Sequence, residues 1–253
     1  MSGAVRSERA AGHLTLTLAN PERANAIDPA MIAALESELA AAAADPGVRC
    51  VAIRGEGERS FCAGFDLGHL ASGPGTARGL ERLMATLRDF PVPVLAVING
   101  HAIGAGFELA ACCHLRIARE GAKVGLPAVQ LGVAYREAGI AAMLEAAPAT
   151  RRLLLTGEPA PIESVPGFAD LVLPATELDA AVDRTLGALA QAAPAALNYM
   201  LRLVCALSQR RLDAPERARF DAERDRLLAL PDLAEGVAAR RERRPPSFQE
   251  RVP

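Results

Sequence analysis

The apolar run at residues 93–100, PVLAVING, most constrains the fold of this chain. An uninterrupted apolar segment of this length is typical of a parallel strand that is buried on both faces. Residues 13–19, HLTLTLA, alternate apolar and small polar side chains, and residues 48–55, VRCVAIRG, form another apolar run. Both patterns also predict strands. The chain is therefore expected to contain a sheet with at least one deeply buried strand.

Helices are expected between these strands. Asp28 is a good helix cap and Pro29 suits the first helical position, so a helix is predicted from there to the Asp45-Pro46-Gly47 turn. A second helical pattern covers residues 76–90 and is closed by Pro91. Strands that alternate with helices predict an α/β fold with a mostly parallel sheet.

The rest of the chain is expected to be largely helical from about residue 151 onward. With 253 residues, 51% of them hydrophobic and 23% charged, the chain is long enough for one substantial globular domain and a helical appendage. We expect a core domain over residues 1–190 and a C-terminal helical region over residues 191–253. The basic, proline-broken C-terminal segment is expected to be a solvated end, and phosphate binding is the alternative.

Composition excludes several classes of function. A net charge of −2 and the absence of Trp argue against nucleic-acid binding. No segment reaches the roughly 18 apolar residues of a membrane helix, and the first residues have no apolar core of a signal peptide. The five cysteines form no C-x-x-C pair and have no histidine at a metal-ligand spacing. We therefore expect a cytoplasmic protein with reduced cysteines and no metal site.

Two glycine-rich turns follow expected strands. Residues 60–70 read SFCAGFDLGHL, and residues 99–110 read NGHAIGAGFELA. The Gly104-Ala105-Gly106 segment opens a helix, whose first turn has free N–H groups. Two such groups from neighbouring strand ends can converge on one carbonyl oxygen and form an oxyanion hole. Tight packing of a strand against a helix is the alternative interpretation, and spacing alone favours neither.

One acid, Glu108, interrupts the apolar segment after the second turn. A buried carboxylate costs free energy unless it is paired or used. Burial would raise the pKa of Glu108 and suit it to proton transfer. The alternative is a carboxylate whose hydrogen bonds come from helix N–H groups.

The SFCAGFDL segment followed by PVLAVINGHAIGAGFELAACCHLRIA resembles the crotonase (enoyl-CoA hydratase/isomerase) superfamily. Other matching segments occur in the expected order, namely NPERANAID, VGLPAVQLGV, LLLTGEP and EGVAARRERRPPSF. The resemblance implies an α/β fold built as a spiral of ββα or βαβ units with a C-terminal helical region. It also implies a homotrimer or dimer of trimers that acts on an acyl-CoA substrate through a thioester enolate, with no cofactor besides that coenzyme A.

The resemblance also assigns roles by position. It places the oxyanion-hole N–H groups at Phe65 and Ala105, and it makes Glu108 the first of the two catalytic glutamates of a hydratase. The C-terminal Arg243 and Arg244 fall where relatives reach the CoA phosphates. The other substrate-binding candidates near the two turns and the PERANA segment are Arg23, Ala24, Ala26, Ala63, Gly64, Asp66 and Gly104.

The chain departs from the hydratase pattern after Pro127. Hydratases have a glutamate at the next position, whereas this chain has Ala128, which cannot transfer a proton. The following segment contains Tyr135, Arg136 and Glu137. Tyr135 is a further catalytic candidate, and Glu137 is another if its loop turns it inward, the alternative being a surface charge. Arg136 is a candidate for holding a substrate carboxylate, and a solvent-facing position is the alternative.

Methylmalonyl-CoA decarboxylases resemble this chain locally, because they have a tyrosine at the position of Tyr135. They place a histidine where this chain has Phe65; His69 lies four residues later, and a surface position is expected for it. His101 and His114 are expected to be structural. Four hypotheses follow: hydration or dehydration of an enoyl-CoA, a double-bond shift, decarboxylation, and CoA binding without catalysis. RNA binding gains little support from the net charge.

Overall fold

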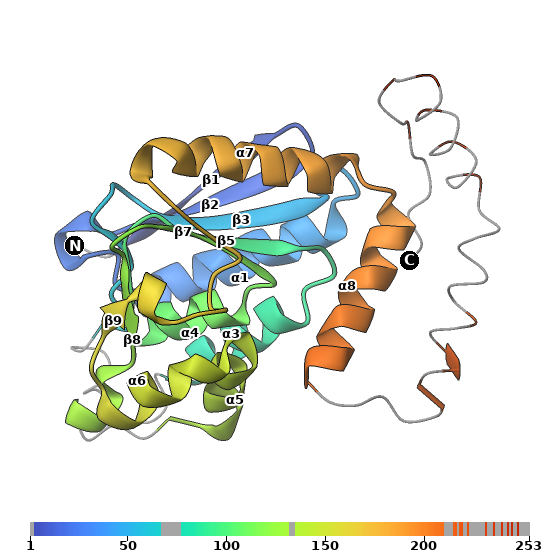
Figure 1. Cartoon of the computed structure of the whole chain (residues 1–253). Helices are drawn as coiled ribbons and strands as arrows, with labels where there is room; N and C mark the ends of the chain where they lie inside the picture. Colours follow the sequence, from blue (N-terminus) through green and yellow to red (C-terminus); the bar gives the residue numbers. More distant parts are fainter. Residues whose placement is uncertain are drawn as a thin grey trace.

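The structure is a computed structural model that describes residues 3–66, 77–131 and 135–209, together with positions 215, 216, 218, 219, 222, 231, 235, 239, 242, 244 and 247 (Figure 1). The strands are β1 Ala4–Ala10, β2 His13–Ala19, β3 Cys50–Gly55, β4 Ser60–Cys62, β5 Val94–Ile98, β6 His101–Ile103, β7 Leu115–Arg119, β8 Lys123–Gly125, β9 Ala160–Pro161 and β10 Leu171–Leu173. The α-helices are α1 Pro29–Ala44, α3 Ala77–Arg88, α4 Ala105–Cys112, α5 Glu137–Ala146, α6 Arg151–Thr156, α7 Ala175–Gln191 and α8 Pro194–Gln209. Short 3₁₀ helices are η1 Pro21–Arg23, η2 Pro127–Leu131, η3 Pro148–Thr150 and η4 Ile162–Ser164.

The described strands form two sheets. The larger has the order β1-β2-β3-β5-β7-β10 and is parallel except for the antiparallel β1–β2 pair. The three strands expected from the sequence, now β2, β3 and β5, are confirmed, as is the mostly parallel sheet. The helices α1 and α3 are also confirmed, and the side chain of Asp28 caps α1 by accepting the N–H of Met31 at 2.8 Å.

The larger sheet separates two apolar layers. Side chains alternate along β3, so Val51 and Ile53 join the main core while Cys50 and Ala52 face the other layer. The same alternation in β5 buries every residue of the strand, which confirms the prediction from PVLAVING. Helix α7 covers one face of this sheet, and α1 lies against the opposite face (Figure 1).

The second sheet has the order β4-β6-β8-β9, and its first three strands are parallel. Each of β3, β5 and β7 is followed within a few residues by one strand of this sheet, and then by helical structure. This repeated unit of two strands and a helix produces the spiral that the resemblance implies. The carboxyl ends of β4 and β6 lie side by side, so the segments that follow them are neighbours.

The two C-terminal α-helices α7 and α8 differ in their contact with the larger sheet. Helix α7 packs on it, and α8 then turns away beside the α/β part (Figure 1). The Asn198 side chain on α8 donates to the Pro91 carbonyl at 2.9 Å, so α8 contacts the turn before β5. The proposed division at residue 190 stays a prediction. In the part of the chain that the structure describes, no helix combines the length and apolarity needed to span a membrane.

Candidate active site

The two glycine-rich turns meet at the ends of β4 and β6. Gly64 has φ +109° and Gly104 has φ +59°, which are conformations that side chains rarely adopt. A Cβ on Gly104 would lie 3.7 Å from the Cα of Gly64, and a Cβ on Gly64 would lie 3.3 Å from the backbone nitrogen of Ala105. The two turns therefore lie close together, as both interpretations that the spacing left open require.

Two backbone N–H groups at this junction have no acceptor among the described residues. Ile27 and Phe65 form a parallel bridge in which Ile27 bonds the residues on either side of Phe65. Ile27 N donates to the Gly64 carbonyl, and Asp66 N donates to the Ile27 carbonyl. The Phe65 N–H therefore faces away from Ile27. The Ala105 N–H begins α4 and has no acceptor within the helix. These are the two donors that the family resemblance assigned to an oxyanion hole.

Close packing fixes the first turn of α4 against β4. A Cβ on Gly106 would overlap the Cys62 carbonyl, so only glycine fits there. The Cys62 Sγ also accepts the Gly64 N–H at 3.4 Å, and this bond stabilises the glycine-rich turn that follows β4. Burial raises the pKa of the Cys62 thiol to about 12, so it remains protonated at neutral pH.

Glu108 lies one turn into α4 and is half-buried. Burial, together with a smaller contribution from the neighbouring Glu81 carboxylate on α3, raises the pKa of its carboxyl to about 7. No hydrogen bond from another described residue reaches the Glu108 carboxyl. The alternative of a carboxylate held by helix N–H groups thus has no support in the described structure. At neutral pH the group is present in both its acid and its base form.

Helix α5 closes the space around this carboxyl. A Cβ on Gly139 would overlap Glu108 Oε1 and lie 3.4 Å from a ring carbon of Tyr135. Burial raises the pKa of the Tyr135 phenol, and the Glu108 charge adds to the effect. Tyr135 and Glu108 are therefore brought together beside Gly139.

The other candidates of this segment are at the surface. The Arg136 side chain is 70% exposed and forms an ion pair with Glu81. Glu137 is exposed in the first turn of α5. An exposed carboxylate is a poor substitute for a buried acid–base group, so the structure gives no support to a catalytic Glu137. Ala128, in η2, is buried in the apolar core, and the carboxyl that hydratases have at this position is absent.

The PERANA segment lies beside the first glycine turn. Ala63 N donates to the Ala24 carbonyl at 3.0 Å, and the Arg23 guanidinium forms an ion pair with Asp66. Ala24 has φ +50°. The structure thus brings together most of the substrate-binding candidates of the sequence, namely Arg23, Ala24, Ala26, Ala63, Gly64, Asp66 and Gly104.

Two asparagines that hold these turns were not singled out from the sequence. The buried Asn25 donates to the Ser60 carbonyl at 2.7 Å and to the Glu56 carbonyl at 3.0 Å. The buried Asn99 similarly bonds both backbone polar groups of Gly55. The sequence contained a signal for both residues, because an asparagine among apolar residues is expected to hydrogen-bond to the backbone.

The remaining candidates have other surroundings. His69 and Arg243 lie outside the described residues. Arg244 forms ion pairs with Glu235 and Glu242. The structural interpretation of His101 and His114 is supported, since their Nδ1 atoms accept the N–H groups of Lys123 and Val94, respectively. Within the described ranges, no group of three or more His, Cys, Asp or Glu side chains is arranged to hold a metal.

Comparison with known proteins gives a consistent result. The family model for enoyl-CoA hydratase/isomerase matches residues 8–251. A probable enoyl-CoA hydratase of Bacillus subtilis is 33% identical over 246 residues, which cover 92% of this chain and 94% of the relative. The 2,3-dehydroadipyl-CoA hydratase of Escherichia coli is 32% identical over 94% of this chain and 95% of its own length.

A crystal structure of an enoyl-CoA hydratase from Polaromonas superposes with a TM-score of 0.88, at 30% identity and over 98% of this chain and 100% of the other. The family model and the relatives cover nearly the whole sequence, and the solved structure shares its fold. The chain belongs to the enoyl-CoA hydratase/isomerase family.

Proposed function

We propose that the chain shifts the double bond of an enoyl-CoA thioester and that Glu108 is the only acid–base group of the reaction. The proposal rests on one observation: Glu108 is a half-buried carboxyl with a pKa of about 7, whereas Ala128 occupies the position of the second glutamate. A double-bond shift needs one group, because the same carboxylate takes a proton from one carbon and returns it to another. Addition of water is helped by two groups, one for the water and one for the α-carbon.

The backbone would stabilise the charge that develops on the thioester oxygen. Proton removal produces an enolate, and the Phe65 and Ala105 N–H groups have no other described acceptor. One such donor is typically worth about 10²–10³ in rate. In this proposal, Arg23, Ala24, Ala26 and Ala63 bind the coenzyme A part of the substrate, and no further cofactor is needed.

Two other reactions have specific support. Hydration is favoured by the names of the two relatives, a probable enoyl-CoA hydratase and a 2,3-dehydroadipyl-CoA hydratase, each of which matches more than nine-tenths of this chain. Decarboxylation of a methylmalonyl-CoA-type substrate is favoured by Tyr135, because its raised phenol pKa keeps it protonated beside Glu108. The protonated phenol is then available as a donor.

A small panel of thioesters distinguishes these reactions. The protein is incubated with 3-butenoyl-CoA, crotonyl-CoA and methylmalonyl-CoA, and the products are analysed by liquid chromatography and mass spectrometry. We expect 3-butenoyl-CoA to become crotonyl-CoA without a change in mass. Gain of water would replace the proposal by hydration, and loss of carbon dioxide would replace it by decarboxylation. Coenzyme A binding without any turnover would indicate a protein that has lost catalysis.

The role of Glu108 is tested by Glu108→Gln, which keeps the size of the side chain. General acid–base catalysis contributes about 10²–10⁴ in rate, so turnover is expected to fall by at least 10²-fold. Affinity for coenzyme A should change little. The matched control is Glu158→Gln, because Glu158 is exposed and lies outside the site. Unchanged turnover in the Glu108 variant would contradict the proposed role.

We also propose a cytoplasmic homotrimer or dimer of trimers, following the family resemblance. The exposed apolar side chains of Val129 and Leu155 support a contact between copies, because such side chains are usually covered. Size-exclusion chromatography with light scattering tests the assembly. A monomer at micromolar concentration would contradict it.

A further inference from the structure

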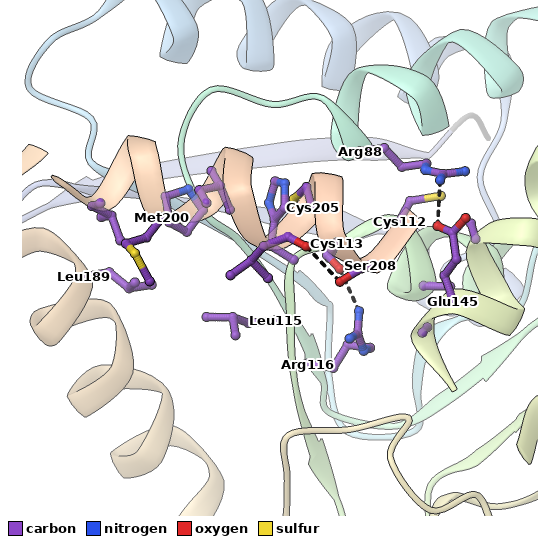
Figure 2. Close-up of a pocket in the computed structure, with 18 residues that line it drawn as sticks. Arg88, Cys112, Cys113, Leu115, Arg116, Glu145, Leu189, Met200, Cys205 and Ser208 are labelled. Carbon is purple, nitrogen blue, oxygen red and sulfur yellow. Dashed lines mark hydrogen bonds and ion pairs between the residues drawn. The ribbon is translucent and has the colours of Figure 1, made fainter. Parts of the chain in front are cut away.

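A cavity of about 330 Å³ lies between α8 and the α/β part of the molecule (Figure 2). Its walls come from the C-terminal end of α4, the start of β7, the second half of α5 and the inner side of α8. Most of the lining is apolar, and its larger apolar side chains are those of Leu115, Leu189, Leu197, Met200, Leu201 and Val204. Met200 and Val204 are more than half exposed, so the cavity opens to solvent along α8.

Most of the charge in this lining is neutralised. Arg88 Nη2 and Glu145 Oε2 are 2.7 Å apart and form an ion pair, as Figure 2 shows. Burial lowers the pKa of His114 to about 4, so its imidazole is neutral at pH 7. Together these three groups contribute no net charge.

Arg116 differs from them because it is a buried cation. The residue is only 9% exposed, and its guanidinium donates to the carbonyls of Phe168, Cys113 and Ala110. No carboxylate among the described residues forms an ion pair with this guanidinium. Asp170 instead accepts the backbone N–H of Arg116 at 2.7 Å. Carbonyl dipoles stabilise a desolvated cation without neutralising it, and the donors of Nη2 have no acceptor in the described structure.

We propose that this cavity binds a medium-chain carboxylate, with the carboxylate at Arg116 and the alkyl chain against the apolar side of α8. The buried positive charge selects an anion, and the surrounding leucine and methionine side chains select a hydrocarbon. The volume is at the lower end of that of ligand cavities, which suits a molecule of the size of octanoate and excludes a whole CoA thioester. The lining includes Cys112 but not Glu108, so this site is separate from the candidate active site and does not rest on the proposed reaction.

Calorimetric titration of the full-length protein with octanoate tests the proposal, with octanol as the uncharged comparison. We expect saturable binding of octanoate at one site per chain and at least tenfold weaker binding of octanol. Substitution of Arg116 would also remove three backbone contacts and can prevent folding. The cavity is therefore filled instead by Val204→Trp, which should weaken octanoate binding more than tenfold.

The matched control is Leu207→Trp. Leu207 lies on the same helix and is 56% exposed, close to the 54% of Val204, but it does not line the cavity. Octanoate binding should be unchanged in this variant. Absence of binding, equal affinity for octanol, or equal effects of the two tryptophan variants would each overturn the proposal. Displacement of octanoate by coenzyme A would also overturn it, because the ligand would then occupy the active site.

Discussion

At the scale of single residues, the pKa of Glu108 depends in part on a neighbouring side chain that the sequence does not reveal. Glu81 raises the pKa of Glu108 from another helix and is itself paired with Arg136. The motif located Glu108, Phe65 and Ala105 because the glycine spacing is local. Glu81 lies 27 positions before Glu108, and its influence depends on how α3 packs near α4. Nothing in the local pattern of α3 marks this residue.

This arrangement predicts a pH profile. Proton removal requires ionised Glu108, so kcat/KM should rise with pH and level off above about 7. Glu81→Gln removes a negative charge and frees the positive charge of Arg136, and both changes lower the pKa of Glu108. The midpoint of the rise should move down by roughly half a pH unit or more. Rate measurements from pH 5 to 9, with Glu158→Gln as control, check this expectation, and an unmoved midpoint would contradict it.

At the scale of elements, long strands and capped helices were predictable, whereas short elements were not. β2, β3, β5 and α1 have a clear apolar period or a cap. β4, β6 and β8 have three residues each, which is too short for a period to appear. β1 reads AVRSERA and is mostly exposed, so no apolar period marks it in the sequence, and it is recognised as a strand by its backbone pairing with β2. Two of these unpredicted strands, β4 and β6, are the ones that align the two glycine turns.

The contact between α4 and α5 predicts opposite effects for two glycine substitutions in helices. Gly139→Ala places a methyl group on the Glu108 carboxyl, so we expect lower turnover and a loss of about 1–3 kcal/mol in unfolding free energy. Gly187→Ala in α7 meets no atom within 4 Å and should stabilise the protein by up to about 1 kcal/mol. Urea denaturation and the isomerase assay measure both effects. Equal behaviour of the two variants would show that α5 does not close on Glu108.

At the scale of the whole molecule, the raised pKa of Glu108 makes folding stability depend on pH. Below about pH 4.5 this carboxyl is protonated in both the folded and the unfolded chain. Between about pH 4.5 and 7 the unfolded chain releases the proton while the folded chain keeps it, so stability falls as pH rises. Glu108→Gln removes this effect. The difference in unfolding free energy between variant and parent should therefore be on the order of 3 kcal/mol more favourable to the variant at pH 8 than at pH 4.

Unfolding of both proteins at the two pH values, with Glu158→Gln alongside, measures that difference. If the difference in unfolding free energy between parent and variant were the same at both pH values, the Glu108 carboxyl would be hydrated in the folded state. This whole-molecule effect follows from the burial of one side chain, and the sequence predicted its direction but not its size.

The exposed strand β1 has a consequence for how copies of this protein coexist at high concentration. It forms one edge of the larger sheet, and Arg6, Glu8 and Arg9 make that edge charged. Sheet edges with free backbone groups invite pairing with other chains, and charged side chains discourage it. A chain without β1 would expose the apolar, alternating β2 as its edge and would be prone to aggregate through strand addition. β1, whose sequence has no apolar alternation, therefore covers the edge of β2, whose sequence alternates clearly.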